Sequence, residues 1–263
     1  MTLVVFTPTY RPGGLDVLEA SLMRQTYRDF VWLVSDQKFL ERKDVWADII
    51  RRVDFPIMFV NRQVKQGRKR NLAEMYNVAA DYVLSDGFSM LVSLQDYIYI
   101  PPDGLERFVE QSAKLPNSLL TGVTHISRDP FPNRISDLSG SYTIFSVPYH
   151  EKPSRMSWED VRATELYFHG PTVLPVEIAH WEANWAAAPR KVFEDGVRWD
   201  ETYDMGIAYE NMDFAQQAAL KGYDVVLDKK NIAISLPHKD YFDGEREEIE
   251  EFSNREYYEK KWQ

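Results

Sequence analysis

The chain has 263 residues, 44% of them hydrophobic and 27% charged, with no cysteine. This composition excludes a disordered chain and a disulfide-stabilised one, and no apolar run reaches the roughly eighteen residues of a membrane-spanning helix. The net charge of −10 is uneven, because residues 1–70 carry 13 Lys and Arg against 8 Asp and Glu, and the rest carries 18 against 33. A basic N-terminal third suits a nucleotide diphosphate or a nucleic-acid backbone, although ordinary solvated surface has the same pattern.

The N-terminal residues and the glycosylation signals bear on localisation. Residues 1–6 lack the basic region of a signal peptide and lead directly to a turn at Pro8. The sequence has no Asn-x-Ser/Thr sequon. Together with the absence of cysteine, these features lead us to expect a cytoplasmic protein.

The first hundred residues alternate between buried strands and helices. Short apolar runs predict strands at residues 3–6, 30–34, 57–60 and 90–94, and helical spacing of apolar residues predicts helices at 15–23 and 72–83. This order is typical of a mostly parallel, right-handed α/β sheet. Ligands of such sheets bind beyond the carboxyl ends of the strands, where Asp36 and Asp96 would lie. The sequence lacks the glycine-rich motifs of dinucleotide-binding and P-loop proteins.

The second half is less regular. The pattern predicts a strand at 118–124, a lobe of little periodicity at 128–180 and a helix at 210–221. Two further short strands are expected at 225–227 and 232–234. We therefore expect a single domain at residues 1–240, with a nucleotide-binding half at 1–100 and an acceptor-binding half at 101–240, followed by a charged C-terminal helix at 241–263.

A series of short motifs follows these elements in a fixed order. They are Thr7-Pro8-Thr9-Tyr10, Gln25-Thr26-Tyr27, Ser35-Asp36, Gly67 with Arg70-Asn71, Gln95-Asp96-Tyr97 with Pro101-Pro102-Asp103, Trp199-Asp200-Glu201 and Glu210-Asn211-Met212-Asp213. In this order and at these separations the chain resembles the family 2 glycosyltransferases over roughly residues 3–240. The resemblance implies the GT-A fold and an inverting transfer of a sugar from a nucleotide diphosphate.

The resemblance also implies which residues bind the donor and a metal ion. The expected donor-binding residues are Pro8, Thr9, Tyr10, Asp36, Gly67, Arg70, Gln95 and Asp96, with Asp36 at the position that reads uracil. Asp96 and His238 are the expected ligands of Mn²⁺ or Mg²⁺, an ion that would neutralise charge on the departing diphosphate. The chain departs from the family pattern at Gln95 and Tyr97, which replace the outer acids of Asp-x-Asp, and at Ser35, which replaces the first acid of the uracil pair.

A third departure concerns catalysis. Asn211 stands where the family commonly has the aspartate that acts as general base, so Glu210 is expected to accept the proton of the acceptor hydroxyl, with Asp213 as second candidate. The alternative is that these two carboxylates only favour the helix dipole. The aromatic side chains Trp181, Trp185 and Trp199 are expected to bind the acceptor, or else to belong to the core.

These expectations combine into one function and two alternatives. The leading hypothesis is a metal-dependent enzyme that moves a sugar from a UDP-sugar donor to a hydroxyl of a saccharide or glycolipid. Hydroxymethylated pyrimidines of phage-type DNA are an alternative acceptor, favoured by the basic N-terminal third and disfavoured by the acidic remainder. A non-catalytic nucleotide-sugar-binding protein is the alternative from another class, suggested by the replaced acids.

Overall fold

The computed structural model describes residues 1–9, 15–60, 71–85, 87–126, 171–206, 208–235 and 244–263. Its strands are β1 (Leu3–Thr9), β2 (Phe30–Asp36), β3 (Ile57–Phe59), β4 (Met90–Leu94), β5 (Ile98–Tyr99), β6 (Ser118–Ile126), β7 (Val173–Pro175), β8 (Trp185–Pro189) and β9 (Asp224–Ser235). Its α-helices are α1 (Leu15–Met23), α2 (Lys43–Arg52), α3 (Leu72–Ser85), α4 (Gly104–Lys114), α6 (Arg190–Glu194), α7 (Glu210–Leu220) and α8 (Gly244–Trp262). Two short 3-10 helices are η3 (Ile178–His180) and η4 (Glu201–Met205).

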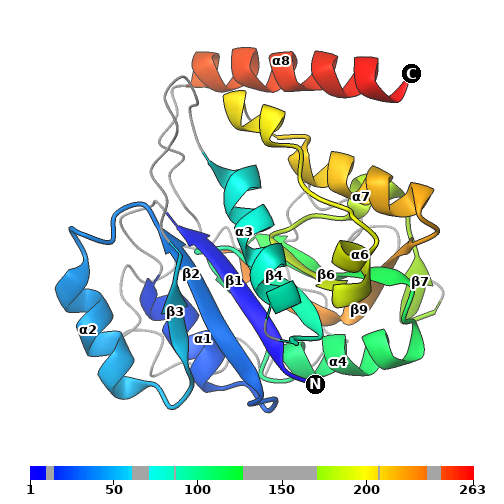
Figure 1. The fold of residues 1–263 in the computed structure, drawn as a ribbon. Coiled ribbons are helices and arrows are strands. Elements are labelled where there is room, and N and C mark those ends of the chain that lie inside the picture. The colour runs from blue at the N-terminus through cyan, green and yellow to red at the C-terminus, as the bar shows by residue number, and fades with distance from the viewer. Residues whose placement is uncertain (10–14, 61–70, 86, 127–170, 207, 236–243) are drawn as a thin grey trace.

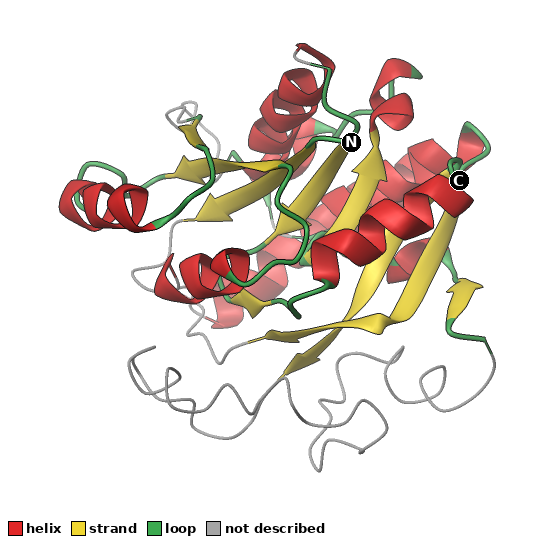
Figure 2. Ribbon diagram, turned by 90° about the horizontal axis from the view of Figure 1, so that it is seen from below, coloured by secondary structure: helices red, strands yellow, loops and turns green. Residues whose placement is uncertain are grey.

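All described strands belong to one sheet of order β3-β2-β1-β4-β8-β6-β9-β5, with β7 beside β9. Strands β1 to β4 pair in parallel, and so do β6 and β9, while β8 runs antiparallel between β4 and β6. Figure 2 shows this sheet with helices packed against it. The carboxyl ends of β1, β2 and β4 therefore meet at one edge, as the sequence predicts.

The two faces of the sheet are covered by different helices. Alternate side chains of a strand point to opposite faces, and in β1 Val4 and Phe6 lie in one apolar cluster while Leu3 and Val5 lie in another. The first cluster includes side chains of α3, α6 and α7, and the second those of α1, α2 and α4. The result is a three-layer α/β/α arrangement in which α3 and α7 share one face (Figure 1).

The predicted strands and helices of the first half are present. The α-helices α2, α4 and α6 and the strands β5, β7 and β8 were not expected, and residues 225–227 and 232–234 belong to one strand, β9, rather than two. The pairing of β6 with β9 passes from Gly122↔Asp228 to Val123↔Ile232, so residues 229–231 form a bulge. This bulge interrupts the apolar pattern and explains why the sequence suggested two strands.

The bulge brings a polar side chain to a buried tryptophan. Asn231 is fully buried, accepts a hydrogen bond of 2.9 Å from Trp185 Nε1 and donates one of 3.1 Å to the Gly104 carbonyl. A Cβ added to Gly122 would overlap the Trp185 indole, and one added to Gly104 would lie 2.9 Å from it. Trp185 therefore occupies space that the two glycines leave open, in the core between β8 and α4.

Two of the sequence motifs serve this packing. Gln25, at the end of α1, donates hydrogen bonds to the Ser21 and Pro101 carbonyls and accepts one from the Leu105 amide. Thr26 bonds through its amide to the Pro102 carbonyl. The Gln-Thr-Tyr and Pro-Pro-Asp segments thus hold α1 against the start of α4, which is a structural role.

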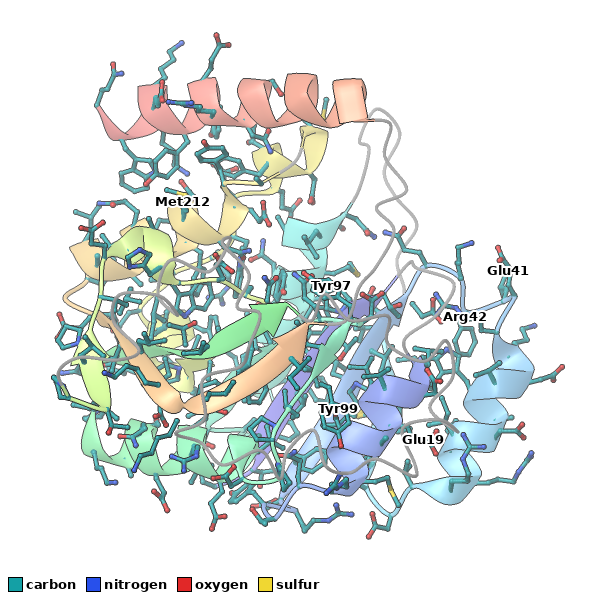
Figure 3. The ribbon with its side chains drawn as sticks, turned by 180° about the vertical axis from the view of Figure 1, so that it is seen from behind. Glu19, Glu41, Arg42, Tyr97, Tyr99 and Met212 are labelled. Atoms are coloured by element: carbon teal, nitrogen blue, oxygen red, sulfur yellow. The ribbon has the colours of Figure 1, made fainter. Side chains whose placement is uncertain are left out.

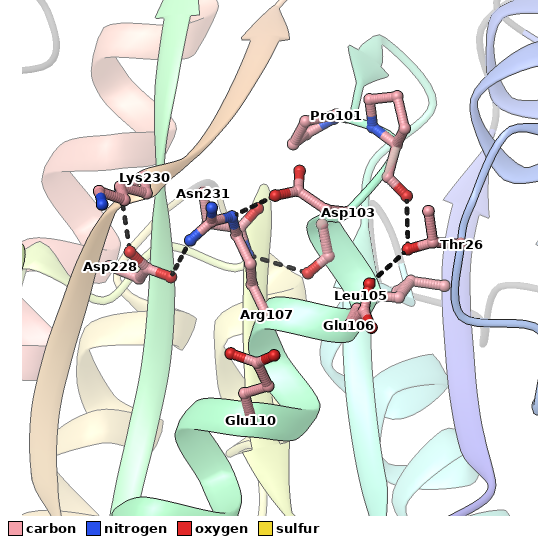
Figure 4. A network of polar contacts seen from close by, with 12 residues as sticks. Thr26, Pro101, Asp103, Leu105, Glu106, Arg107, Glu110, Asp228, Lys230 and Asn231 are labelled. Atoms are coloured by element: carbon pink, nitrogen blue, oxygen red, sulfur yellow. Dashed lines mark hydrogen bonds and ion pairs between the residues drawn. The ribbon is translucent and has the colours of Figure 1, made fainter. Parts of the chain in front are cut away.

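Helix α4 is also fastened to β9 through charged side chains. Arg107 Nε donates to Asp103 over 2.7 Å, and its Nη1 lies 3.7 Å from the buried carboxylate of Asp228 (Figure 4). Burial raises the pKa of Asp228, and the neighbouring guanidinium together with the Lys230 amide opposes that rise. This network joins α4 to β9 through Arg107 and Asp228, which lie more than a hundred residues apart in the sequence.

Within the described part of the chain, no helix is both long and apolar enough to cross a membrane.

Candidate active site

The centre of the site is formed where β1 and β4 end. Thr9, the last residue of β1, donates a hydrogen bond of 2.7 Å from Oγ1 to Oδ2 of Asp96, which follows β4. Both side chains are buried. Pro8 lies one residue earlier, paired with Ser35 of β2, and Thr9 itself pairs with Asp36. The structure thus brings four of the predicted donor-binding residues to one edge of the sheet.

Asp36 lies at this edge with its carboxylate held by several donors. Its Oδ2 accepts 2.7 Å from Trp46 Nε1, and its Oδ1 accepts 2.7 Å from the Lys38 amide and lies 3.0 Å from Arg42 Nη2. Arg42 is itself buried, between the end of β2 and the start of α2 (Figure 3). These contacts fix the orientation of the carboxylate and engage both of its oxygens within the protein.

The two residues that replace acids beside Asp96 hold the loop after β4 in place. The hydroxyl of Tyr97 donates to Asn184 Oδ1 over 3.1 Å, and the amide of Gln95 bonds to the Asn184 carbonyl. Tyr97 lies above the ends of the central strands in Figure 3. The site therefore has one acid at this position, Asp96, in a loop fastened by its neighbours.

Tyr76 of α3 links this loop to the other side of the site. Its hydroxyl lies 2.7 Å from Ser93 Oγ of β4. Burial raises the pKa of Tyr76, the charge of Glu210 raises it further, and hydrogen bonds with Ser93 and Gln95 lower it in part. The hydroxyl therefore stays protonated, and its hydrogen bond joins α3 to β4. Sequence reasoning missed Tyr76, although a tyrosine inside an apolar helix face is a usable signal for a buried polar contact.

Helix α3 is anchored to the segment that precedes α7. Asp204 of η4 accepts hydrogen bonds from the amides of Ala73 and Glu74, at 2.9 and 3.1 Å, and so caps the first turn of α3. Asn77 bonds to both backbone atoms of Trp199, each over 2.9 Å. These contacts fix η4 and the residues leading to α7 against α3.

Glu210 begins α7 and is oriented by its neighbour. Trp199 Nε1 donates to Asn211 Oδ1 over 3.2 Å, and Asn211 Nδ2 donates to Glu210 Oε1 over 3.2 Å. Glu210 is largely buried, and its negative charge contributes to the raised pKa of Tyr76, whose hydroxyl bonds to Ser93 of β4. Asn211 cannot accept a proton, but it holds the carboxylate that could.

Asp213 is not placed for the same task. Its Oδ1 accepts from Trp262 Nε1 at 2.9 Å, from Lys261 Nζ at 2.8 Å and from the Tyr203 hydroxyl at 3.3 Å, and its Oδ2 accepts from Gln217 at 2.7 Å. The side chain is fully buried. With its acceptor positions taken by four donors, Asp213 anchors the C-terminal helix, which corrects its assignment as second candidate base.

The three tryptophans expected to bind an acceptor are core residues instead. Trp181, Trp185 and Trp199 expose 1%, 1% and 2% of their surface. Trp199 stacks on Phe214 with ring centroids 3.8 Å apart, and Trp181 also stacks on Phe214, with centroids 5.0 Å apart. Since no indole face is open to a sugar ring, this burial corrects the prediction, and a large apolar side chain is more often used for packing.

Several predicted residues lie outside the described residues: Tyr10, Gly67, Arg70, His238 and most of the lobe at 128–180. Their roles stay predictions. Among the described residues, no group of three or more His, Cys, Asp and Glu side chains is arranged to hold a metal ion.

Comparisons with known proteins support the fold. No family model matches the sequence, and no curated protein is similar to it. Solved structures of S. aureus TarS are similar: residues 1–349 in complex with UDP give a TM-score of 0.56 at 13% identity over 90% of this chain and 61% of that one. The complex of the same residues with UDP-GlcNAc gives a TM-score of 0.56 at 13% identity, over 91% of this chain and 60% of that one.

A further structure of S. aureus TarS gives a TM-score of 0.55 at 14% identity, over 90% of this chain and 37% of that one. This chain therefore spans less than two thirds of the TarS chains that it matches. The likeness confirms the predicted fold class, a mixed α/β fold with a mostly parallel central sheet, consistent with GT-A.

Proposed function

We propose that this chain is an inverting glycosyltransferase that moves a sugar from a UDP-sugar to an acceptor hydroxyl. The observation that carries the proposal is the hydrogen bond between Thr9 and Asp96, which joins two motifs 87 residues apart at the carboxyl edge of a parallel sheet. Two further observations support it: the motif order resembles that of the family 2 glycosyltransferases, and TarS, similar in fold, binds UDP and UDP-GlcNAc.

The donor would lie across the ends of β1, β2 and β4. Asp36 is the proposed contact to the base on the motif resemblance, although its buried carboxylate is already held by Trp46 and Arg42. Pro8, Thr9 and Gln95 would lie beside the diphosphate. Gly67 and Arg70, which lie outside the described residues, would also contact it. A basic side chain such as Arg70 suits the phosphate oxygens.

A divalent cation, Mn²⁺ or Mg²⁺, fits this site only together with the donor. Asp96 supplies one carboxylate, and the described residues supply no cluster of ligands around it. Such ions are commonly held by one or two carboxylates with substrate phosphates and water completing the shell, so we propose Asp96 as a ligand and His238 as a second. When bound, the cation would neutralise the charge that develops on the departing diphosphate.

Glu210 is the proposed general base. As the acceptor oxygen attacks the anomeric carbon, its proton passes to Glu210 and the bond to the diphosphate breaks with its electron pair leaving on oxygen. Asn211 donates a hydrogen bond to Oε1 of Glu210 and so holds the orientation of that carboxyl group. We propose a saccharide or glycolipid hydroxyl as acceptor.

The test is a panel of UDP-sugars, including UDP-GlcNAc, with release of UDP measured with and without Mn²⁺. Slow hydrolysis of one member in the absence of acceptor, accelerated by Mn²⁺, supports an enzyme with the proposed donor. Binding of UDP without release of UDP from any member would favour the non-catalytic alternative. Salt-dependent binding of hydroxymethylated DNA, weakening by roughly one log unit per log of salt for each phosphate neutralised, would favour the DNA acceptor.

A further inference from the structure

The backbone immediately before Glu210 has an unusual conformation. Ala208 and Tyr209 have φ angles of 64° and 67°, and they are the non-glycine residues with positive φ in the described part of the chain. The left-handed region is strained for an L-residue, and two such residues in succession need outside support. Tyr209 occupies the N-cap position of α7 and offers no side-chain cap. The turn that presents Glu210 is therefore held by something other than local preference.

That support comes from the C-terminal helix. Asn254 of α8 is buried and donates from Nδ2 to the Ala208 carbonyl over 3.0 Å and to the Tyr203 carbonyl over 3.1 Å. The ring of Tyr258, one turn further along α8, lies 5.5 Å from that of Tyr209. One amide thus ties both ends of the segment that runs from η4 to α7.

The helix is itself fixed over this segment by a second set of contacts. Lys261 Nζ lies 2.8 Å from both Asp200 and Asp213, and the Tyr257 hydroxyl donates to Asp200 over 2.8 Å. Figure 3 shows Met212, in the first turn of α7, directly beneath α8. Helix α8 is therefore anchored by contacts that do not involve Asn254, and these contacts hold Asn254 beside the turn.

We propose that Asn254 is a positioning residue, which holds the left-handed turn at Ala208 and Tyr209 so that Glu210 points into the site. The C-terminal helix is then part of the catalytic apparatus rather than an appended charged tail. This inference rests on the proposed role of Glu210 as general base. Displacing a catalytic group by about 1 Å can reduce a rate about a hundred-fold, so a loosened turn would affect turnover more than donor binding.

The test uses the full-length chain with Asn254→Ala and, as matched control on the same helix, Glu256→Ala, whose side chain is exposed. Asn254→Ala is expected to lower kcat for UDP release from UDP-GlcNAc, or from the UDP-sugar that the parent uses, about ten- to a hundred-fold, with the KM for the donor within about two-fold. Glu256→Ala keeps both constants. Equal loss in both variants, or an unchanged kcat in Asn254→Ala, overturns the proposal.

A rescue experiment separates holding the turn from packing the helix. Glycine adopts positive φ without strain, so in an Ala208→Gly background the loss of Asn254 should reduce kcat several-fold less than in the parent background. The same background also keeps the experiment interpretable if Asn254→Ala alone folds poorly. An identical loss in both backgrounds means that Asn254 acts only by packing, and the proposal fails.

Hydrogen exchange supplies a readout that needs no turnover. In Asn254→Ala, amides of residues 208–212 should exchange about ten-fold faster than in the parent, while those of α3 keep their rates. If the parent turns over no UDP-sugar, the proposed function fails. The hydrogen-exchange measurement then still decides whether Asn254 holds the turn. Unchanged exchange at residues 208–212 overturns the inference even in an active enzyme.

Discussion

The side-chain amide of Asn211 donates a hydrogen bond to Oε1 of Glu210 over 3.2 Å, while its oxygen accepts one from Trp199 over the same distance. An indole N–H can only donate, so the Asn211 oxygen must face Trp199 and its NH₂ group must face Glu210. Asn211 thus orients the carboxylate beside it.

Replacing Glu210 tests this assignment directly. Glu210→Gln is expected to retain UDP binding and to lower kcat about a hundred- to ten-thousand-fold, since a general base acts mainly in the transition state. Asp213→Asn serves as the comparison, because it should lower the melting temperature by weakening the contact with Lys261 while keeping a measurable kcat. Kinetics with the active UDP-sugar and thermal unfolding of both variants check this. A parent-like kcat in Glu210→Gln would place the base elsewhere.

Asn211→Asp restores the family's acid and is expected to reduce activity. The new carboxylate would stand beside Glu210 at the distance of the present hydrogen bond, where two like charges repel and the donor to Oε1 is lost. We expect kcat to fall about ten-fold, as a general base contributes most when correctly placed. A rise in kcat would instead mean that position 211 remains the base position and that Asn211 weakens the enzyme.

The link between donor binding and a cation should depend on Asp96. UDP together with Mn²⁺ is expected to raise the melting temperature more than either alone, because a ligand that binds only the native state stabilises it by mass action. Asp96→Asn should remove this synergy and leave the smaller effect of UDP. Thr9→Val, which removes only the hydrogen bond to Asp96, should weaken it without abolishing it. Undiminished synergy in Asp96→Asn would exclude Asp96 as a ligand.

The tryptophans provide a test of the core assignment. Trp185→Phe leaves Asn231 without its indole donor, whereas Trp181 Nε1 has no hydrogen-bond partner among the described residues. Trp185→Phe should therefore lower the free energy of unfolding by about 1–3 kcal/mol more than Trp181→Phe, which urea denaturation can measure. Both should leave the KM for an acceptor unchanged once one is identified. A KM effect without a stability effect would return these side chains to the acceptor site.

The pH dependence of Lys261→Met reports the docking of α8. Burial alone would raise the pKa of Asp200, but hydrogen bonds from Lys261, Thr202 and Tyr257 outweigh it and lower the pKa below the usual range. Burial alone would lower the pKa of Lys261, but the hydrogen bonds with Asp200 and Asp213 outweigh this effect and raise the pKa. A lowered acid pKa contributes stability that is lost as pH falls below the unfolded value of about 3.9, and a raised lysine pKa contributes stability that is lost as pH rises above about 10.4.

The parent should therefore exceed Lys261→Met in free energy of unfolding by about 2 kcal/mol between pH 5 and 9, as for hydrogen bonds to charged groups, and the difference should shrink toward both extremes. Urea denaturation across this range measures it. Lys260→Met, whose side chain is exposed on the same helix, is the control. A difference that stays constant down to pH 3 would exclude the pairing with Asp200.

Much of the fold follows from local pattern. The apolar runs that end at Thr9 and Asp36 and before Gln95 have the length and the flanking turn residues of buried parallel strands, so the sequence alone predicts that these side chains meet at one sheet edge. Strand β8 escaped prediction because Trp-Ala-Ala-Ala-Pro carries little strand preference, and only its neighbours β4 and β6 make it a strand.

The surroundings of Glu210 are decided by partners far away in the sequence. Asp204 caps α3 from 131 residues away, Trp199 and Trp185 are enclosed by elements from both halves, and Asn254 reaches back to Ala208. A sequence pattern records which residues share one face of an element, because that depends on the period of the helix or strand. It does not record which distant donor satisfies a buried carboxylate, since that pairing is fixed only when the layers pack and every buried polar group must find a partner.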